Sequence, residues 1–264
     1  MPGLGTVLVS AAVAVAVLML ATWLVSLPIR NASIVDIVWG LGFVVVAWTA
    51  FLVSDGADPR RWLLTGLTTV WGLRLSVYLA MRNLGKEEDY RYQEMRRRHD
   101  DRFGLVSLGT VFGLQGVLMW VVSLPVQVGQ VPATPPSLTW IDYLGAAVWL
   151  VGLLFESVGD WQLARFKADP ANKGKVMDRG LWRYTRHPNY FGDFVVWWGL
   201  YLIALATGVA WWTVIGPIVM SILLIRVSGK AMLEKTIGRR RPGYDDYIRR
   251  TSGFFPMPPK RASR

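Results

Sequence analysis

The amino-acid sequence predicts an all-α membrane protein with about seven transmembrane helices, an outside N-terminus and a cytoplasmic C-terminus. Three observations support this prediction: 53% of the 264 residues are hydrophobic, the apolar residues form long blocks, and the mean hydropathy is +0.33. A helix needs roughly 20 apolar residues to cross the hydrocarbon core of a bilayer. The candidate spans, in order, are residues 6–27, 34–53, 62–80, 105–124, 141–158, 190–209 and 211–227.

The first and the last two spans need separate justification. Residues 1–6 carry no Lys or Arg, and the apolar run after them is longer than that of a signal peptide, so we expect a retained helix. Between the last two spans only Gly208 and Ala210, beside Trp211 and Trp212, indicate a turn. A tight helical hairpin and a single broken segment are therefore both open.

Positive charge predicts the orientation of these spans. Residues 81–104, residues 159–189 and the tail from residue 226 hold 7, 7 and 11 of the 29 lysines and arginines, whereas the loop 125–140 holds none. Lys and Arg accumulate on the cytoplasmic side, so the three charged segments are expected there. The net charge of +11 then reflects topology and attraction to membrane lipids, and nucleic acid is not an expected partner.

Composition excludes several kinds of site. The chain has no cysteine and two histidines, which argues against disulfides, a cysteine nucleophile or a metal centre. Residues 1–264 form one membrane domain with no internal repeat, and the sequence does not indicate an oligomeric state. We interpret residues 81–104 as a solvated helix with charge pairs one turn apart, and a lid over a cytoplasmic pocket is the alternative.

Ionisable side chains within predicted spans indicate where function resides, because such groups are costly in a bilayer unless they face a bundle interior. Glu156 and Asp160 share one helix face through their i, i+4 spacing. An interhelical ion pair would explain any one pair of these ionisable residues. Most of them, however, lie near the cytoplasmic boundary, which favours a shared polar site. The set comprises Asp36, Arg74, Glu156, Asp160, Asp193, Arg226, Lys230 and Glu234, with the polar Gln115.

The segment 166–192 interleaves cations with aromatic residues. Cations can neutralise phosphates and rings can stack on a base, so the segment suits an anionic nucleotide. A positive-inside loop without a ligand is the alternative, and the chain has no Gly-rich dinucleotide fingerprint. The groups concerned are Lys167, Lys173, Lys175, Arg179, Arg183, Arg186, Asn172, Asn189, Trp182, Tyr184 and Tyr190.

One motif adds a family resemblance. Arg186-His187-Pro188-x-Tyr190-x-Gly192 resembles a superfamily of membrane proteins that includes steroid 5-alpha reductases, sterol C14 reductases and isoprenylcysteine carboxyl methyltransferases. The flanking elements Asp160-x-Gln162-Leu163, Leu233-Glu234, Tyr244-x-x-Tyr247 and Arg250-Thr251-Ser252 are most similar to a bacterial branch of the 5-alpha reductase-like group. The resemblance implies an integral protein of the bacterial inner membrane, with a cofactor-binding half at 150–259 and a lipid substrate pocket at 1–124.

The resemblance allows two cofactors, since the reductases bind NADPH and the methyltransferases bind S-adenosylmethionine. The methyltransferase pattern has two adjacent glutamates where this chain has only Glu234, and the many cations suit the phosphates of NADPH. We therefore expect an NADPH-dependent reductase of a carbon–carbon double bond in a lipophilic steroid, isoprenoid or fatty-acyl substrate. The alternatives are a lipid or prenyl methyltransferase that uses S-adenosylmethionine, and a non-enzymatic membrane assembly protein.

The resemblance and the cationic segment together give the candidate site residues. The reductases polarise an enone carbonyl with a glutamate and a tyrosine; Asp36 and Trp71 stand nearest those places. Trp71 cannot transfer a proton usefully, so Tyr78, Tyr90 or Tyr92 could supply one. The catalytic candidates are Asp36, Trp71, Arg74 and Tyr78. The cofactor-binding candidates are Glu156, Asp160, Arg165, Lys167, Asn172, Lys173, Lys175, Arg179, Tyr184, Arg186, His187, Asn189, Tyr190, Asp193, Arg226, Lys230, Glu234, Tyr244 and Tyr247.

Overall fold

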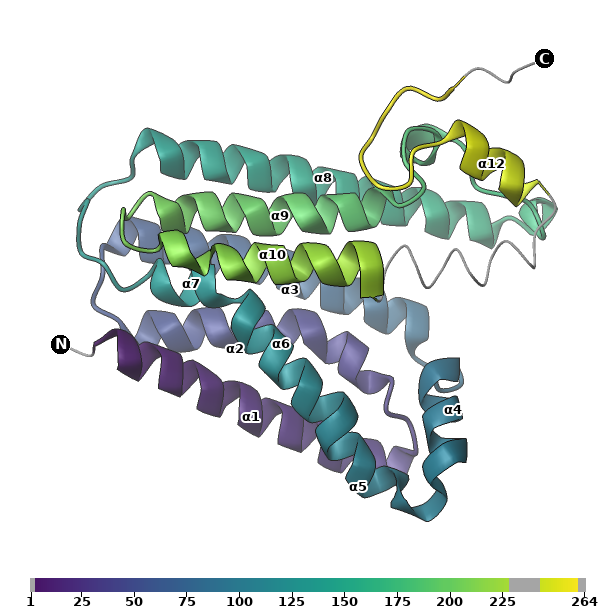
Figure 1. Cartoon of the computed structure of the whole chain (residues 1–264), viewed down its shortest axis with the longest axis horizontal. Helices are drawn as coiled ribbons and strands as arrows, with labels where there is room; N and C mark the ends of the chain where they lie inside the picture. Colours follow the sequence, from purple (N-terminus) through teal and green to yellow (C-terminus); the bar gives the residue numbers. More distant parts are fainter. Residues whose placement is uncertain (1–2, 228–242, 261–264) are drawn as a thin grey trace. The chain divides into compact units, whose positions relative to one another are not determined.

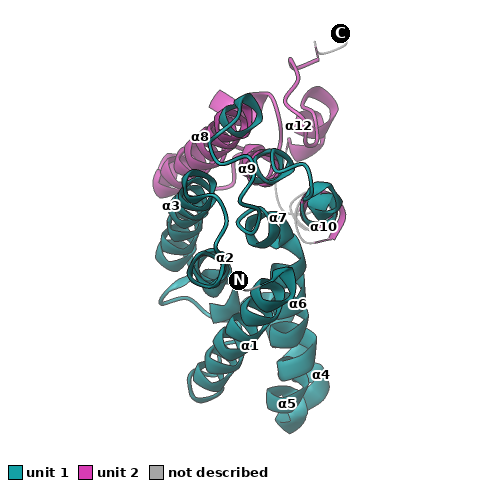
Figure 2. Cartoon of the chain, turned by 90° about the vertical axis from the view of Figure 1, so that its left-hand side faces the viewer, with its two compact units in different colours: residues 1–143, 200–216 teal, residues 144–199, 217–264 magenta. Residues whose placement is uncertain are grey.

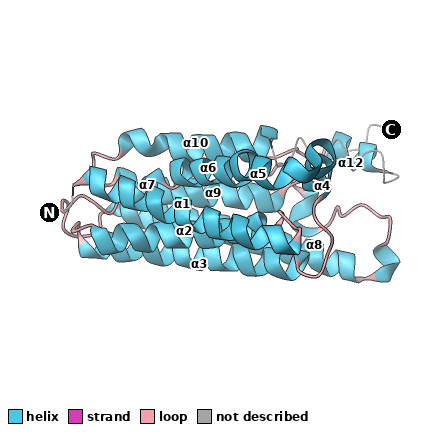
Figure 3. Cartoon of the chain, turned by 90° about the horizontal axis from the view of Figure 1, so that it is seen from below, coloured by secondary structure: helices cyan, strands magenta, loops and turns pink. Residues whose placement is uncertain are grey.

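The computed structural model describes residues 3–227 and 243–260, which form helices joined by turns (Figure 1). No strand occurs among these residues (Figure 3), although Thr185 and Ser252 form an isolated β-bridge. Within the described ranges, five segments are long and apolar enough to cross a membrane, namely Leu4–Ile29, Ile34–Val53, Asp58–Asn83, Tyr90–Val122 and Trp140–Ala168. The chain is thus an all-helical integral membrane protein, while seven spans and their orientation stay predictions.

Short 3-10 and π-helical stretches, labelled η, join or interrupt the α-helices. The elements in chain order are α1 (Leu4–Ile29), α2 (Ile34–Val53), α3 (Asp58–Asn83), α4 (Tyr90–His99), η1 (Asp100–Arg102), α5 (Phe103–Ser107), η2 (Leu108–Gly113), α6 (Leu114–Val122), α7 (Leu124–Val128), α8 (Trp140–Ala168), η3 (Pro170–Asn172), η4 (Gly180–Arg183), α9 (Pro188–Leu205), η5 (Trp211–Val214), α10 (Ile215–Ile222), η6 (Leu223–Val227) and α12 (Tyr244–Arg250).

Contacts between residues divide the chain into two compact units, which Figure 2 colours separately. Unit 1 comprises residues 1–143 and 200–216, and unit 2 comprises residues 144–199 and 217–264. The predicted catalytic residues therefore belong to unit 1, and the predicted cofactor-binding residues belong to unit 2.

In unit 1, helix α2 packs closely against α3. A β-carbon on Gly40 would overlap the carbonyl oxygen of Gly72, so the two backbones approach as only glycines allow. One residue after Gly40, the backbone N–H of Leu41 donates a 2.9 Å hydrogen bond to Ser76 Oγ on α3. Asp36 lies one helical turn before Gly40, so this crossing holds the part of α2 next to Asp36 in place.

A buried ion pair holds the far end of unit 1. Arg60, at the start of α3, donates from Nε and Nη2 to the two carboxylate oxygens of Asp142 at 2.9 and 3.1 Å. Neither side chain is more than 1% exposed. Thr139 donates to the same carboxylate from its backbone N–H and its hydroxyl, so the segment before α8 is anchored to α3.

In unit 2, helices α8 and α9 cross at glycines. A β-carbon on Gly192 would overlap the backbone nitrogen of Glu156 and lie 2.6 Å from the carbonyl oxygen of Gly152. Gly159 lies against Pro188 and the backbone nitrogen of Asn189. The side chains flanking these glycines are consequently pressed together.

Two helix boundaries differ from the prediction. Helix α8 continues to Ala168 instead of ending near residue 158, because the polar residues after Asp160 are good helix formers and Asp169-Pro170 first interrupts the backbone. Arg165 and Lys167 consequently lie on a helix. Most of the fourth predicted span, 105–124, is the apolar part of the longer helical segment Tyr90–Val122, which ends two residues before the predicted limit.

The last two predicted spans form a helical hairpin. Helix α9 ends at Leu205, and Gly208 has a φ of 75°, a left-handed value that favours glycine. The hydroxyl of Tyr201 donates to the carbonyl of Trp211 at 3.1 Å. In unit 2, Trp198 Nε1 donates to Ser221 Oγ at 3.3 Å, so α9 and α10 lie side by side (Figure 1).

Candidate functional site

The first cluster of buried polar side chains lies where α8 faces α9 in unit 2. Glu156 and Asp160 project from one face of α8, and Asn189 and Asp193 project from one face of α9. Asn189 Nδ2 donates a 3.0 Å hydrogen bond to Asp160 Oδ1. All three carboxylates are buried. The structure thus gathers four of the predicted cofactor residues, which we name the α8/α9 cluster.

The α8/α9 cluster is rich in hydrogen-bond acceptors. Asn189 Oδ1 is buried and has no hydrogen-bond partner among the described residues. An unsatisfied buried acceptor of this kind costs about 1–3 kcal/mol. Ionised carboxylates are also acceptors, so the cluster is suited to a ligand that brings N–H and O–H donors.

The motif arginine, Arg186, holds the C-terminal segment in place. Its Nη1 donates to the carbonyl oxygens of Ile248, at 3.1 Å, and Thr251 at the end of α12. Its backbone N–H donates to the carbonyl of Ser252 at 2.9 Å. The preceding Thr185 hydroxyl donates to the carbonyl of Phe254 at 2.7 Å. The side-chain hydrogen bonds to Ile248 and Thr251 both come from Nη1. Contact between the rest of the guanidinium and a cofactor stays a prediction.

The neighbouring motif residues are also packed. The ring of His187 is buried and stacks on Tyr190, with centroids 5.5 Å apart. Tyr247 is buried beside Tyr244, and its hydroxyl donates to the carbonyl of Trp182. The two short motifs that are far apart in the sequence, around residues 182–190 and 244–254, therefore fold against each other.

The cationic segment lies at the surface of unit 2. Lys167, Lys173, Lys175, Arg179 and Tyr184 are exposed, as is Arg165 on the last turns of α8. Arg226 is exposed at the end of η6, whereas Lys230 and Glu234 lie outside the described residues.

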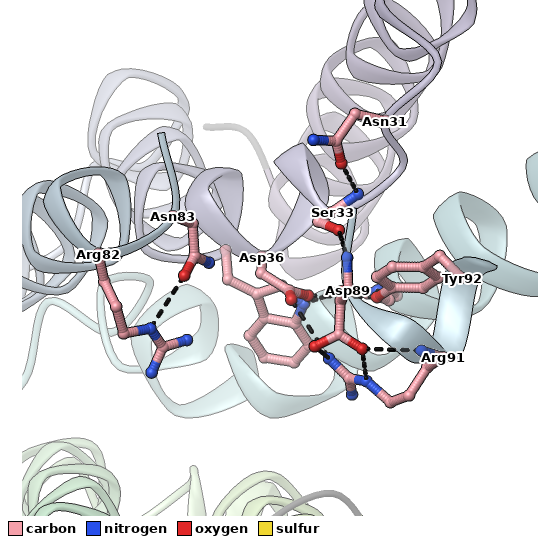
Figure 4. A network of polar contacts seen from close by, with 10 residues as sticks. Asn31, Ser33, Asp36, Arg82, Asn83, Asp89, Arg91 and Tyr92 are labelled. Atoms are coloured by element: carbon pink, nitrogen blue, oxygen red, sulfur yellow. Dashed lines mark hydrogen bonds and ion pairs between the residues drawn. The ribbon is translucent and has the colours of Figure 1, made fainter. Parts of the chain in front are cut away.

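In unit 1, Asp36 accepts hydrogen bonds at both carboxylate oxygens (Figure 4). Arg91 Nη2 lies 3.3 Å from Oδ2, and the hydroxyl of Tyr92 donates to Oδ1 at 3.2 Å. Gln115 Nε2 donates to the Tyr92 hydroxyl at 3.1 Å, and the indole N–H of Trp39 donates to Gln115 Oε1. The ion-pair partner of Asp36 is thus Arg91 instead of Arg74.

The segment before α4 is docked onto the turn between α1 and α2. Glu88 Oε1 accepts from the backbone N–H of Ala32 at 2.7 Å, and Ser33 Oγ accepts from the backbone N–H of Asp89 at 2.7 Å. On α4 itself Glu94 pairs with Arg97 and Arg98, which confirms the predicted charge pairs one turn apart. The docking contacts position Tyr92 next to Asp36.

The other predicted catalytic residues do not contact Asp36. Trp71 is fully buried and its ring packs against Phe43 at 5.5 Å. The guanidinium of Arg74 lies 5.4 Å from the ring of Tyr78, which Arg82 also approaches.

Sequence reasoning gave little weight to Arg91 and overlooked the pair Arg60–Asp142. Arg91 is one of many charged residues in the segment 81–104, and only the folded structure shows that its partner is Asp36. Opposite charges at the outer ends of the third and fifth spans were a usable signal for Arg60 and Asp142, because such groups in an apolar setting need partners.

Several membrane-length helices, one of which, α8, carries part of a buried cluster of carboxylates and an amide, define a polytopic membrane protein with a polar site. Residues 22–251 match the family described as Protein of unknown function (DUF1295), and the chain belongs to that family. This family is the steroid 5-alpha reductase-like group, so the resemblance is confirmed at the level of the family. An uncharacterized protein of Schizosaccharomyces pombe is 22% identical over 263 residues, covering 89% of this chain and 75% of the yeast protein. No solved structure matches the chain.

Proposed function

We propose that this protein is an NADPH-dependent reductase that saturates a carbon–carbon double bond in a lipophilic substrate drawn from the bilayer. The observation that supports this best is the α8/α9 cluster, in which the unpartnered Asn189 Oδ1 lies beside buried carboxylates. The resemblance to the steroid 5-alpha reductase-like group supports the same kind of reaction, the reduction of a carbon–carbon double bond. The substrate can be a steroid, an isoprenoid or a fatty-acyl chain.

The residues of unit 2 fit NADPH by their chemistry. The carboxamide of a nicotinamide and the hydroxyls of its ribose are donors, and the acceptors of the α8/α9 cluster would bind them. Lys173, Lys175 and Arg179 would neutralise phosphate oxygens. When bound, the cofactor supplies a hydride and is oxidised to NADP⁺.

The proposed substrate end is the network around Asp36. A double bond that accepts a hydride must also gain a proton, and Trp71 has no suitable one. Tyr92 is buried and its hydroxyl lies between Asp36 and Gln115, whereas Tyr90 is exposed. We therefore assign proton donation to Tyr92, with Asp36 and Gln115 positioning its hydroxyl.

A methyltransferase that uses S-adenosylmethionine is the second candidate. The buried carboxylates of the α8/α9 cluster favour it, because a sulfonium cation is stabilised by negative charge. The third candidate, a non-enzymatic membrane assembly protein, would use polar pairs such as Arg60–Asp142 only to lock helices together.

Ligand-dependent thermal stability separates these candidates. A ligand that binds only the folded protein raises its stability by about 2.7 kcal/mol at a concentration of about 100 times Kd. For the purified full chain we expect the melting temperature to rise with NADPH, less with NADH, and not with S-adenosylmethionine. Asn189→Ala should reduce the NADPH effect, and Asn83→Ala is the matched control in unit 1. A shift with S-adenosylmethionine alone would favour the methyltransferase, and no shift with any of the three would favour the assembly protein.

A further inference from the structure

A pocket of about 350 Å³ opens at the end of α8 in unit 2, apart from the α8/α9 cluster. Ligand pockets have volumes of roughly 300–1,000 Å³, so its size suits one part of a nucleotide. The last turns of α8, the η3 turn and the residues before η4 line it, including Trp161, Arg165, Asn172 and Arg179.

Local hydrogen bonds shape the wall of this pocket. Asp169 accepts from the backbone N–H of Ala171 at 2.9 Å and from Asn172 Nδ2 at 3.2 Å. Asn172 Nδ2 also donates to the carbonyl of Phe166 at 3.1 Å, which ties the turn to α8. Gln162 Oε1 accepts from the backbone N–H of Leu181 at 3.0 Å. The turn and the start of η4 are therefore fixed to the helix.

Positive charge exceeds negative charge in the lining of the pocket, because Arg165 and Arg179 stand against the single carboxylate of Asp169. Across residues 3–227 and 243–260, neither Arg165 nor Arg179 forms an ion pair with a carboxylate. Asp169, the acidic residue in the lining, is engaged by the turn. Two guanidinium groups line one small pocket, which attracts an anion.

The pocket also offers a flat aromatic surface. Trp161 is 58% exposed, and the guanidinium of Arg165 lies 5.6 Å from the centre of its ring. An exposed indole beside a planar cation can stack on a purine base. A ligand that carries both an anion and a base would use the two guanidinium groups and the indole of this lining.

We propose that this pocket binds the 2′-phosphoadenosine end of NADPH and makes the protein select NADPH over NADH. The proposal rests on the proposed function, since it names the part of the cofactor that the pocket takes. A phosphate monoester carries close to two negative charges near pH 7, and an arginine can bind two of its oxygens at once. NADH has a hydroxyl in that position and would leave both arginines without an anionic partner.

Direct binding measurements on the full chain in nanodiscs test the pocket. The probes are NADPH, NADH, 2′,5′-ADP and 5′-AMP. Arg165→Ala and Arg179→Ala should each weaken NADPH and 2′,5′-ADP by about tenfold or more, and should change NADH and 5′-AMP by less than about threefold. Arg249→Ala is the matched control, because it removes an exposed arginine on α12 that does not line the pocket. It should leave all four affinities unchanged.

Three results would overturn the assignment. Unchanged NADPH binding in both variants would show that the 2′-phosphate binds outside this pocket, and the reductase proposal would still stand. Equal losses for NADPH and NADH would show that the arginines do not read the extra phosphate. If both variants instead lost bound anionic phospholipid in native mass spectrometry while 2′,5′-ADP bound normally, the pocket would hold a lipid headgroup.

The two proposals can also fail separately in the other direction. Arginine-dependent binding of 2′,5′-ADP without binding of intact NADPH would support the pocket and contradict the reductase. Absence of binding for every probe would contradict both.

Discussion

The hydroxyl of Tyr92 donates a 3.2 Å hydrogen bond to Asp36, although the two residues are 56 positions apart in the sequence. Arg91 contacts the other oxygen of the same carboxylate and is held in turn by Asp89 at 2.8 Å. This arrangement gives Arg91 two acidic partners, and it gives Asp36 a cation and a hydroxyl.

Asp36→Asn should remain folded. Arg91 keeps Asp89, so no buried cation is left without a partner and the stability loss should be nearer to about 1 kcal/mol than to the roughly 3–5 kcal/mol of a broken buried pair. NADPH affinity should be retained, and substrate-dependent oxidation of NADPH should fall because a neutral amide holds the Tyr92 hydroxyl less firmly than an ionised carboxylate does. Melting temperature, NADPH affinity and turnover are measured beside Glu87→Gln, an exposed control. Full turnover in the folded variant would remove Asp36 from the mechanism.

Gly192→Ala should destabilise unit 2. The added methyl group would meet backbone atoms of α8, which cannot rotate away, so the helices must separate at a cost of about 1–3 kcal/mol or more. Gly66→Ala on α3 is the control, since a β-carbon there meets no atom within 4 Å. That change should be neutral or stabilising by up to about 1 kcal/mol. Thermal melting with the two variants in parallel checks this, and equal melting temperatures would contradict the close crossing.

Arg60→Ala should be among the most damaging changes in unit 1. It leaves the buried Asp142 carboxylate with only the Thr139 donors, and breaking a buried pair costs roughly 3–5 kcal/mol. Replacing both partners, as Arg60→Met with Asp142→Leu, should recover most of that loss because no charge stays buried. A double-mutant cycle on melting temperature measures the recovery. Additive losses would mean that the two side chains act independently.

The contribution of Asp89 should depend on pH. Burial acts to raise the pKa of its carboxyl group, but hydrogen bonds from Arg91 outweigh burial and hold the pKa below its usual value of 3.8. A group with a lowered pKa in the folded state stabilises the protein above its usual pKa, and this contribution is lost as the pH falls through the folded value. The difference in melting temperature between wild type and Asp89→Asn should thus be constant above about pH 5 and shrink below it. The exposed Asp55→Asn is the control, and a difference independent of pH would contradict the role of Arg91.

The predicted orientation can be tested by cysteine labelling, because the native chain has no cysteine. Ser137 is exposed in the loop 125–140, whereas Gln130 in the same loop is buried and would react poorly whatever its side. A membrane-impermeant reagent should label Ser137→Cys in intact cells and label Met257→Cys only after the membrane is opened. Labelling of both positions from outside would reject the cytoplasmic C-terminus.

The sequence was a good guide to helices and a poor guide to partners. The second span was predicted at 34–53 and is α2 with the same limits, because a polar turn ends the apolar run on each side. The end of α8 was missed, since hydropathy marks where a helix leaves the bilayer and does not show where its backbone stops. The i, i+4 spacing of Glu156 and Asp160 correctly put both on one face, because that relation is local.

Contacts between distant segments could not be derived in the same way. The choice of Arg91 over Arg74 as the partner of Asp36 depends on how the segment before α4 docks, which no local pattern encodes. Likewise, the cationic segment predicted that Arg186 contacts the phosphates of a nucleotide, and it gave no sign that carbonyl oxygens of the chain itself would be partners of this side chain.

The contacts of Arg186 affect which substitutions α12 and the segment after it can accept. Its guanidinium recognises the path of the main chain at residues 248 and 251, and every amino acid has a carbonyl there. The hydrogen bonds from Arg186 therefore do not depend on the side chains at positions 248 and 251, which are constrained only by their own packing. Lysine at 186 would place a flexible ammonium group where Arg186 has a planar guanidinium, so the two hydrogen bonds that leave Nη1 would lose their fixed direction. Recognition of the main chain at residues 248 and 251 consequently depends on one side chain, that of Arg186.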